Sequence, residues 1–326
     1  MRLLAASPAL APALLAAAGT LVAVPALPAE LQSPLTALSR PENRVALVRS
    51  LGPGPGGQRF AVIAPLHGEA SGELALRTEG LGELCVDPGR RVIVGFTDLL
   101  WRPLERAFVL DPEGPRLLAV DGVGPALLAD HAALHRLLAR GESLPDAQTV
   151  DLLLDLLAVR DPPSRHLAAT ELQMQPTLWT SFGRKEVRRL RRALEDAVED
   201  TYLRFELLQV AAGLAGLGAT DADWVATACR DALADVPVSP DFATHEPALA
   251  IFALQAIAER GGAEDAGLVA RHLESTHPTV GAAAARSLFA VDPEQARVLA
   301  AEALARGTLH AEARQTLEAL LRRVEG

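Results

Sequence analysis

Residues 278–288 read PTVGAAAARSL, and they indicate the architecture of the second half of the chain. A proline is tolerated in the first turn of a helix, where its missing N–H loses no hydrogen bond, and the alanines that follow favour helix and allow close packing. Helical periodicity continues on both sides of it, from residue 146 to the C-terminus. It predicts ten helices, over 146–158, 163–174, 184–198, 202–216, 221–235, 245–260, 264–274, 278–290, 293–305 and 309–324.

The ten predicted helices form five pairs. The second helices of the pairs begin at 163, 202, 245, 278 and 309, and so recur every 31 to 43 residues. This period is in the range of two-helix solenoids. The pattern gives a helix one apolar stripe, formed in 184–198 by Val187, Leu190, Leu194 and Val198. An isolated pair cannot bury such a stripe, so we expect stacked pairs whose last helix has a polar outer face, formed by Arg314, Glu318, Arg322, Arg323 and Glu325.

Residues 278–288 also resemble the second helix of a HEAT repeat, with Pro278 at its start, alanines for close packing and Leu288 at its end. Looser versions occur at 165–172 and 310–317, and Gly281 departs from the arginine that the family often has. The resemblance covers about 180 residues. It implies a HEAT-like α-solenoid over 146–326 and says more about architecture than about biological task.

Residues 44–120 have a different pattern, of short β-like runs separated by glycine and proline. The runs are 44–50, 58–66, 72–78, 82–86, 90–96, 106–110 and 116–120. They predict a small antiparallel barrel or sandwich, with a hairpin across Asp87, Pro88 and Gly89. Residues 85–94, CVDPGRRVIV, resemble OB-type β-barrel modules that precede helical repeats in some exported bacterial proteins.

The expected fold class is therefore α+β. A small β domain occupies 30–122, a connecting helix and linker 123–145, and the solenoid 146–326. In the connecting segment, 130–138 predicts one amphipathic helix with Leu127, Leu134, Leu137 and Leu138 on its apolar side.

The first 29 residues have the pattern of a signal peptide. No charge occurs between Arg2 and Glu30, an apolar core spans 10–24, and small residues follow near Ala26 and Ala29. We expect export to the periplasm or the extracellular space. An uncleaved membrane anchor is the alternative, although four prolines disfavour a continuous helix, and a disordered extension is a second alternative.

Composition lowers the rank of several function classes. The 326 residues carry a formal charge of −10, whereas a general nucleic-acid binder is strongly basic, so this class is disfavoured. Three Trp, one Tyr and eight Phe supply few stacking platforms for bases or sugars. The chain has no nucleophile elbow, HExxH, Walker loop, GxGxxG or CxxC motif, so no catalytic residue and no cofactor are expected.

The densest charge feature is a basic cluster of six cations in nine residues, Arg184, Lys185, Arg188, Arg189, Arg191 and Arg192. Two explanations stay open. It is a solvated helix face supported by the pairs Arg191–Glu195 and Arg192–Asp196, or it binds an acidic partner or lipid headgroups. Cations at the start of a helix and acids at its end oppose the helix dipole, which favours a binding surface.

Histidines and cysteines give weaker signals. His131 and His135 stand one helical turn apart, a spacing that suits a shared metal, but no third ligand is near them, so no metal site is expected. His272 and His277 are interpreted as ordinary polar residues. Cys85 and Cys229, the only cysteines, lie in different predicted domains and are expected to be separate thiols.

These observations favour an exported, non-enzymatic protein-binding scaffold without affinity for nucleic acid. Two alternatives remain. One is an envelope-associated enzyme, or a regulatory subunit of one, with its site in the β domain; the other is a membrane-surface binder that uses the basic cluster. Residues 1–140 hold 13 basic and 13 acidic residues, so the whole negative excess belongs to 141–326. The basic cluster therefore stands out from an acidic background.

Overall fold

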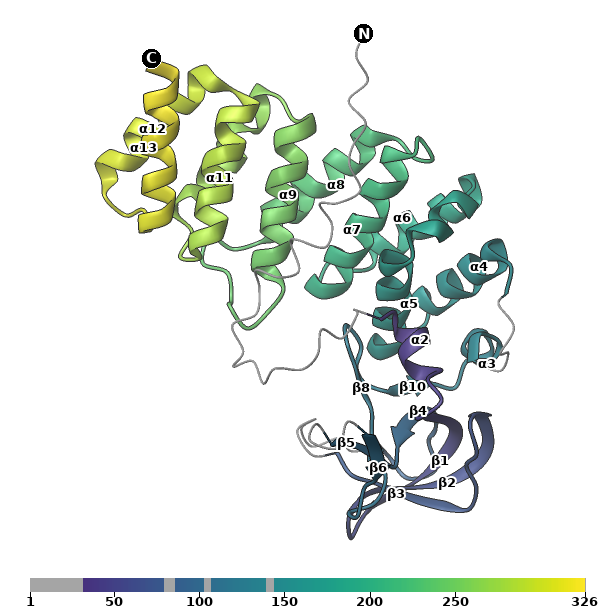
Figure 1. Ribbon diagram of the computed structural model, residues 1–326. Helices are drawn as coiled ribbons and strands as arrows, with labels where there is room; N and C mark the ends of the chain where they lie inside the picture. The colour runs from purple at the N-terminus through teal and green to yellow at the C-terminus, as the bar shows by residue number, and fades with distance from the viewer. Residues whose placement is uncertain (1–31, 79–85, 103–106, 139–143, 326) are drawn as a thin grey trace. The chain divides into compact units, whose positions relative to one another are not determined.

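The computed structural model describes residues 32–78, 86–102, 107–138 and 144–325. An antiparallel β region is followed by a long helical region, which confirms the predicted α+β class (Figure 1). The predicted signal peptide lies outside the described residues. Ser33–Gly326 forms one compact unit, and the division into a β domain and a solenoid near 122–145 stays a prediction.

The main sheet has six antiparallel strands in the order β10–β4–β1–β2–β3, with β7 paired to β4. In the described part of the chain these strands do not close into a barrel. Two separate ribbons, β5–β6 and β8–β9, complete the region. The strands are β1 (Arg44–Gly54), β2 (Gly57–His67), β3 (Glu73–Leu76), β4 (Arg91–Thr97), β5 (Leu99–Arg102), β6 (Ala107–Leu110), β7 (Arg116–Leu117), β8 (Ala119–Val120), β9 (Gly124–Pro125) and β10 (Leu127–Ala129).

The predicted hairpin across residues 87–89 is present as a turn. The Arg90 N–H donates to the Asp87 carbonyl oxygen at 3.2 Å, and Gly89 adopts a φ of +85°, which favours glycine. Most of the run predicted before it, 82–86, lies outside the described residues. Strand β4, after the turn, pairs with β1 and β10.

Both faces of the main sheet carry buried apolar side chains. Along β1, Val45 and Leu47 belong to the same hydrophobic cluster as the helices, whereas Ala46 and Val48 belong to a second cluster on the other face. This division follows from the period of two in a strand. The sheet and the first helices therefore share one continuous core.

The connecting segment differs from its prediction. Helix α3 (Ala132–Leu138) begins only at Ala132, and Leu127 belongs to strand β10, where it pairs with Val94. The helix predicted over 130–138 is confirmed, and only the placement of Leu127 on its apolar side was wrong. Three consecutive apolar residues, such as those of β10, cannot distinguish a short strand from the first turn of a helix.

All ten predicted helices occur, with ends that differ by a few residues. They are α4 (Asp146–Leu157), α5 (Pro162–Met174), α6 (Arg184–Glu195), α7 (Thr201–Gly216), α8 (Ala222–Asp235), α9 (Glu246–Arg260), α10 (Ala266–Arg271, between the short 3-10 helices Ala263–Asp265 and His272–Glu274), α11 (Pro278–Val291), α12 (Pro293–Arg306) and α13 (Ala311–Glu325). The short helices α2 (Pro34–Leu38) and η2 (Pro176–Ser181) were not predicted.

Packing between the helices is consistent with a helical repeat. Each first helix packs against its own second helix, and the second helices pack in succession, α5 on α7, α7 on α9, α9 on α11 and α11 on α13. Polar contacts connect neighbouring pairs at about one repeat of sequence separation. Examples are Arg204–Asp235 at 2.7 Å and Arg230–Asp265 at 2.7 Å.

Helix α6 is shorter than predicted. It ends at Glu195, and Val198, expected on its apolar stripe, is 54% exposed. The turn that follows brings Asp200 to the start of α7, where its carboxylate accepts a hydrogen bond from the Leu203 N–H at 3.0 Å. Ending α6 at Glu195 allows Asp200 to cap α7, and this cap is favoured over extending α6 by the three further residues that were predicted.

Candidate binding surface on helix α6

Helix α6 is held to the core by one face. Val187, Leu190, Ala193 and Leu194 are buried, and Leu190 is fully so. At the start of the helix, the Glu186 carboxylate accepts a hydrogen bond from the Gly183 N–H at 3.0 Å. This acid is the only one in the first turn, where negative charge is favourable.

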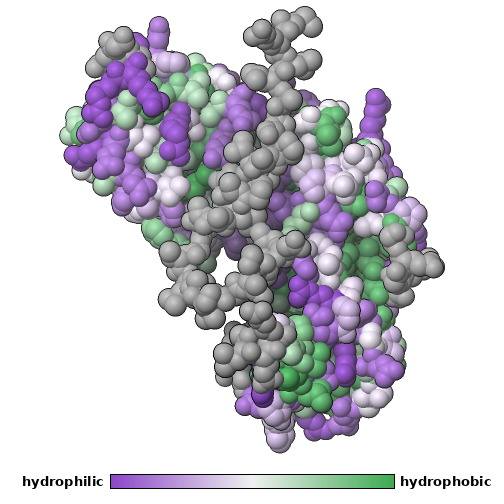
Figure 2. All heavy atoms as spheres, in the orientation of Figure 1, coloured by the Kyte–Doolittle hydropathy of each residue, from purple (hydrophilic) through white to green (hydrophobic). Residues whose placement is uncertain are grey.

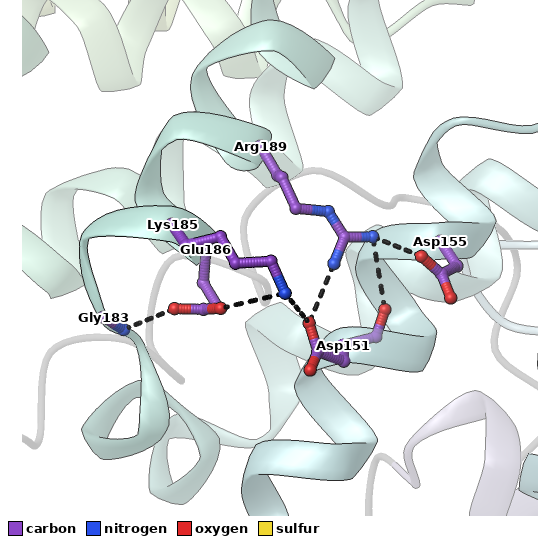
Figure 3. A network of polar contacts seen from close by, with 6 residues as sticks. All are labelled: Asp151, Asp155, Gly183, Lys185, Glu186 and Arg189. Carbon is purple, nitrogen blue, oxygen red and sulfur yellow. Dashed lines mark hydrogen bonds and ion pairs between the residues drawn. The ribbon is translucent and has the colours of Figure 1, made fainter.

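Two cations of the basic cluster bind the preceding helix pair (Figure 3). Arg189 donates to the Asp151 carboxylate at 2.9 Å and to the Asp155 carboxylate at 2.5 Å, both on α4. Lys185 lies 3.5 Å from Asp151. These contacts stabilise the packing of α6 on α4, by less than about 1 kcal/mol for each partly exposed pair.

A third cation binds toward the following pair. The Arg191 guanidinium lies 4.3 Å from the centroid of the Trp224 ring on α8 and donates to the Thr220 hydroxyl at 3.2 Å. The predicted pairs of Arg191 with Glu195 and of Arg192 with Asp196 are not formed. That prediction was wrong: Arg191 lies against the aromatic face that Trp224 of α8 offers, and the Arg192 side chain is exposed.

The remaining three cations are Arg184, Arg188 and Arg192. Their side chains are exposed, and none of these side chains forms an ion pair or a hydrogen bond with a described residue. Their spacing of four residues places them on one face of the helix, along roughly 12 Å. We call these three residues the arginine stripe.

The metal-site candidates are occupied by other contacts. His135 lies 2.7 Å from the Asp130 carboxylate, whose other oxygen lies 2.8 Å from Arg91. The Nδ1 atom of His131 accepts a hydrogen bond from the Ala133 N–H at 3.3 Å, which caps α3. Within the described ranges, no group of three or more His, Cys, Asp or Glu residues is arranged to hold a metal ion.

The other singled-out residues are largely structural. His272 is fully buried, lies 3.2 Å from the Leu233 carbonyl oxygen, and has its pKa lowered to about 4 by burial. It is therefore a neutral core residue, which its position beside a turn did not indicate. His277 stacks on the exposed ring of Phe242. Cys229 is a free, buried thiol, and Cys85 lies outside the described residues.

Sequence reasoning missed a polar cluster between α5 and α7. The Thr170 and Tyr202 hydroxyls lie 2.7 Å apart, and the His166 ring contacts both the Asp200 carboxylate, at 2.8 Å, and the Tyr202 ring. Burial, followed by the charge of the next acid along α7, Glu206, raises the pKa of Tyr202. These residues are about one repeat apart, so only a known repeat register would have paired them.

The β region contributes to the same cluster. Gly122, in the turn between β8 and β9, has a φ of +74°, and a Cβ atom there would collide with Tyr202 and Thr170. Glu206 is 7% exposed, and its Oε2 atom has no hydrogen-bond partner among the described residues. The cluster therefore joins the β region to the helices and contains one buried acid.

Comparison with known proteins gives no family assignment, because no protein-family model, curated protein or solved structure matches the chain. In the described ranges, no helix combines the length and apolar character that crossing a bilayer requires.

Proposed function

We propose that this chain is an exported, non-enzymatic binding scaffold, and that its HEAT-like helical array binds an acidic protein through the arginine stripe of α6. The observation that carries the proposal is the contrast within α6. Arg189 and Arg191 are engaged by neighbouring helices, whereas Arg184, Arg188 and Arg192 are exposed and without a described partner.

Electrostatics supports an acidic partner. The stripe lies in the part of the chain that holds 18 basic and 28 acidic residues, so it is a local positive feature on a negative surface. Such a feature steers an acidic partner to one place and repels it elsewhere. Stacked helices suit this role because they hold exposed side chains on a rigid surface.

Export is supported by the uncharged segment between Arg2 and Glu30. A scaffold is supported over an enzyme by the absence of catalytic motifs from the sequence. The cluster of His166, Asp200 and Tyr202 is explained by its structural contacts between α5 and α7.

The test replaces the arginine stripe by glutamate, as R184E/R188E/R192E, and measures capture from a native envelope extract by quantitative mass spectrometry. Proteins captured by the natural chain are then purified and titrated against both forms. We expect the acidic partner to be lost, with at least about a tenfold weaker Kd. Unchanged capture would refute the proposal.

Two controls keep the result interpretable. The matched variant R297E/R322E/R323E changes the net charge equally at exposed residues of α12 and α13, and should retain the partner. Arg189→Ala should retain it as well, while lowering the free energy of unfolding by up to about 1 kcal/mol. Sedimentation with anionic vesicles that is lost in the glutamate variant, without any protein partner, would support the membrane-surface alternative instead.

A further inference from the structure

Helix α6 carries two neighbouring rows of cations. Arg184, Arg188 and Arg192 form the arginine stripe, and Lys185 and Arg189 form a second row beside it, also with a spacing of four residues. Four residues advance about 6 Å along a helix, and consecutive residues lie about 100° apart around it. The two rows therefore have the same spacing along the helix but face different directions.

The second row shows how α6 pairs with acids on another helix (Figure 3). Its partners are Asp151 and Asp155, which stand four residues apart on α4. Arg189 donates to both carboxylates, at 2.9 and 2.5 Å, and Lys185 lies 3.5 Å from the carboxylate of Asp151. Cations spaced by four residues on one helix are thus matched by acids spaced by four residues on its neighbour.

The arginine stripe faces away from the core. Leu190, which is fully buried, stands two residues after Arg188 and so lies about 200° around the helix from it. The three side chains of the stripe are exposed and have no ion pair or hydrogen bond with a described residue. They extend along about 12 Å of the helix, over which one row of carboxylates at the same spacing can pair with all three.

Acidic residues border the stripe. On the side of α4 lie Asp151 and Asp155, whose side chains are 47% and 52% exposed, and at the end of α6 lie the exposed residues Glu195 and Asp196. A broad polyanion, such as a nucleic-acid duplex or an anionic bilayer, would meet these acids as well as the arginines. A single row of carboxylates would meet the arginines alone, so charge complementarity favours a narrow partner.

We propose that the acidic partner binds the arginine stripe with an α-helix whose carboxylates recur every four residues, lying alongside α6 as α4 does. The inference rests on the proposed function and adds the structure of the element that the partner uses. Acids four residues apart lie on one face of a helix at intervals of about 6 Å, which is the interval of the stripe. Guanidinium and carboxylate groups form directional, often bidentate hydrogen bonds, so the spacing contributes to recognition as well as the charge.

The experiment uses the full chain and two fluorescently labelled, alanine-rich peptides of about 20 residues, a length that forms helix in water. Both peptides have the same composition and the same number of glutamates. The spaced peptide carries glutamate at every fourth residue. The control peptide carries glutamate at every second residue, which places the acids on different sides of a helix and would suit an extended strand instead. Circular dichroism checks that both are helical, and fluorescence anisotropy at low ionic strength measures each Kd.

We expect the spaced peptide to bind about tenfold more tightly than the control peptide. Each exposed ion pair contributes little, so a measurable difference requires all three to form together. Added salt should weaken the binding, because the pairs are exposed.

Two variants assign the binding to the stripe. R184E/R188E/R192E should lose the spaced peptide and should instead bind its counterpart with lysine in place of each glutamate, which also shows that this variant is folded. The matched variant of α12 and α13 should bind the spaced glutamate peptide as the natural chain does. Its three substituted arginines are exposed, and Figure 2 shows further hydrophilic residues over the same two helices.

Three outcomes would overturn this inference. Equal binding of the spaced and control peptides would show that charge is sufficient without spacing. Tighter binding of the control peptide would assign the stripe to an extended segment. Absence of binding by either peptide would show that the stripe does not recognise an acidic helix. Each of these leaves the proposed function standing, since that function fails only if capture from the extract is unchanged by the glutamate substitutions.

Discussion

Glu206 gives the sharpest stability prediction, because it is a buried acid with an incomplete set of hydrogen bonds. It is 7% exposed, and its Oε2 atom has no partner among the described residues. Burial raises its pKa from the ordinary 4.5 to about 7. The perturbation is Glu206→Gln, which keeps the size of the side chain and removes its charge.

The sign follows from where the proton is held. Between pH 4.5 and about 7 the folded state keeps a proton that the unfolded state has released, so stability is highest at low pH and falls as the pH rises through the folded pKa. Between pH 5 and pH 8, Glu206 lowers the free energy of unfolding by about 2 to 3 kcal/mol, because each unit of pKa shift corresponds to about 1.4 kcal/mol. Glutamine does not titrate, so the variant should escape this loss.

The assay is urea unfolding of both forms at pH 5 and pH 8. Other groups titrate in both chains, so the quantity to compare is the difference between the variant and the natural chain at each pH. We expect the free energy of unfolding of the variant, relative to that of the natural chain, to be about 2 to 3 kcal/mol higher at pH 8 than at pH 5. The control is Glu195→Gln, which changes an exposed side chain of α6. It should change the free energy of unfolding by less than about 0.5 kcal/mol at both pH values. If the difference in the free energy of unfolding between Glu206→Gln and the natural chain does not vary with pH, Glu206 does not hold a proton in the folded state as described.

Two further predictions concern packing and reactivity. A Cβ atom at Gly213, inside α7, would collide with the ring of Trp179, so Gly213→Ala should lower the free energy of unfolding by about 1 to 3 kcal/mol in chemical denaturation, although alanine favours helix. Gly216→Ala, in the same helix with open space around it, should be neutral or add up to about 1 kcal/mol, and equal effects would contradict the packing argument. Burial raises the pKa of the Cys229 thiol to about 12, so its peptide should stay unalkylated by iodoacetamide at pH 8 until the chain is unfolded. Rapid labelling of the native chain at Cys229, measured by mass spectrometry, would show that this thiol is accessible.

The sequence predicts the helices well because apolar and small residues recur along them with helical spacing. Helix α11 was expected at 278–290 and occurs at Pro278–Val291, since its small residues are buried against neighbours on several sides. The strands of the β region were harder to predict from the sequence. Strand β5 was missed because its four residues, Leu99 to Arg102, show neither a long run nor a clear alternation of apolar and polar types.

The binding surface was only partly predictable, for a different reason. Periodicity places all six cations on one helix, but it does not say which of them a neighbouring helix engages. Arg189 and Asp155 are 34 residues apart, and their pairing depends on how α6 packs on α4. A local rule instead assigned Arg191 to Glu195, four residues away on the same helix.

Contacts across one repeat explain why three arginines are left exposed. Arg204, Arg230 and Arg306 each bind an acid 31 to 35 residues away, on a neighbouring pair of helices. An arginine in this array thus stabilises the fold when its side chain faces a neighbouring pair of helices. The side chains of Arg184, Arg188 and Arg192 are exposed and form no such contact with a described residue. The helix dipole disfavours the charge of Arg184, which begins α6, but favours that of Arg192, which lies in its last turn. Of the three, Arg184 is therefore the one whose charge the helix itself does not explain, and the proposed acidic partner would account for it.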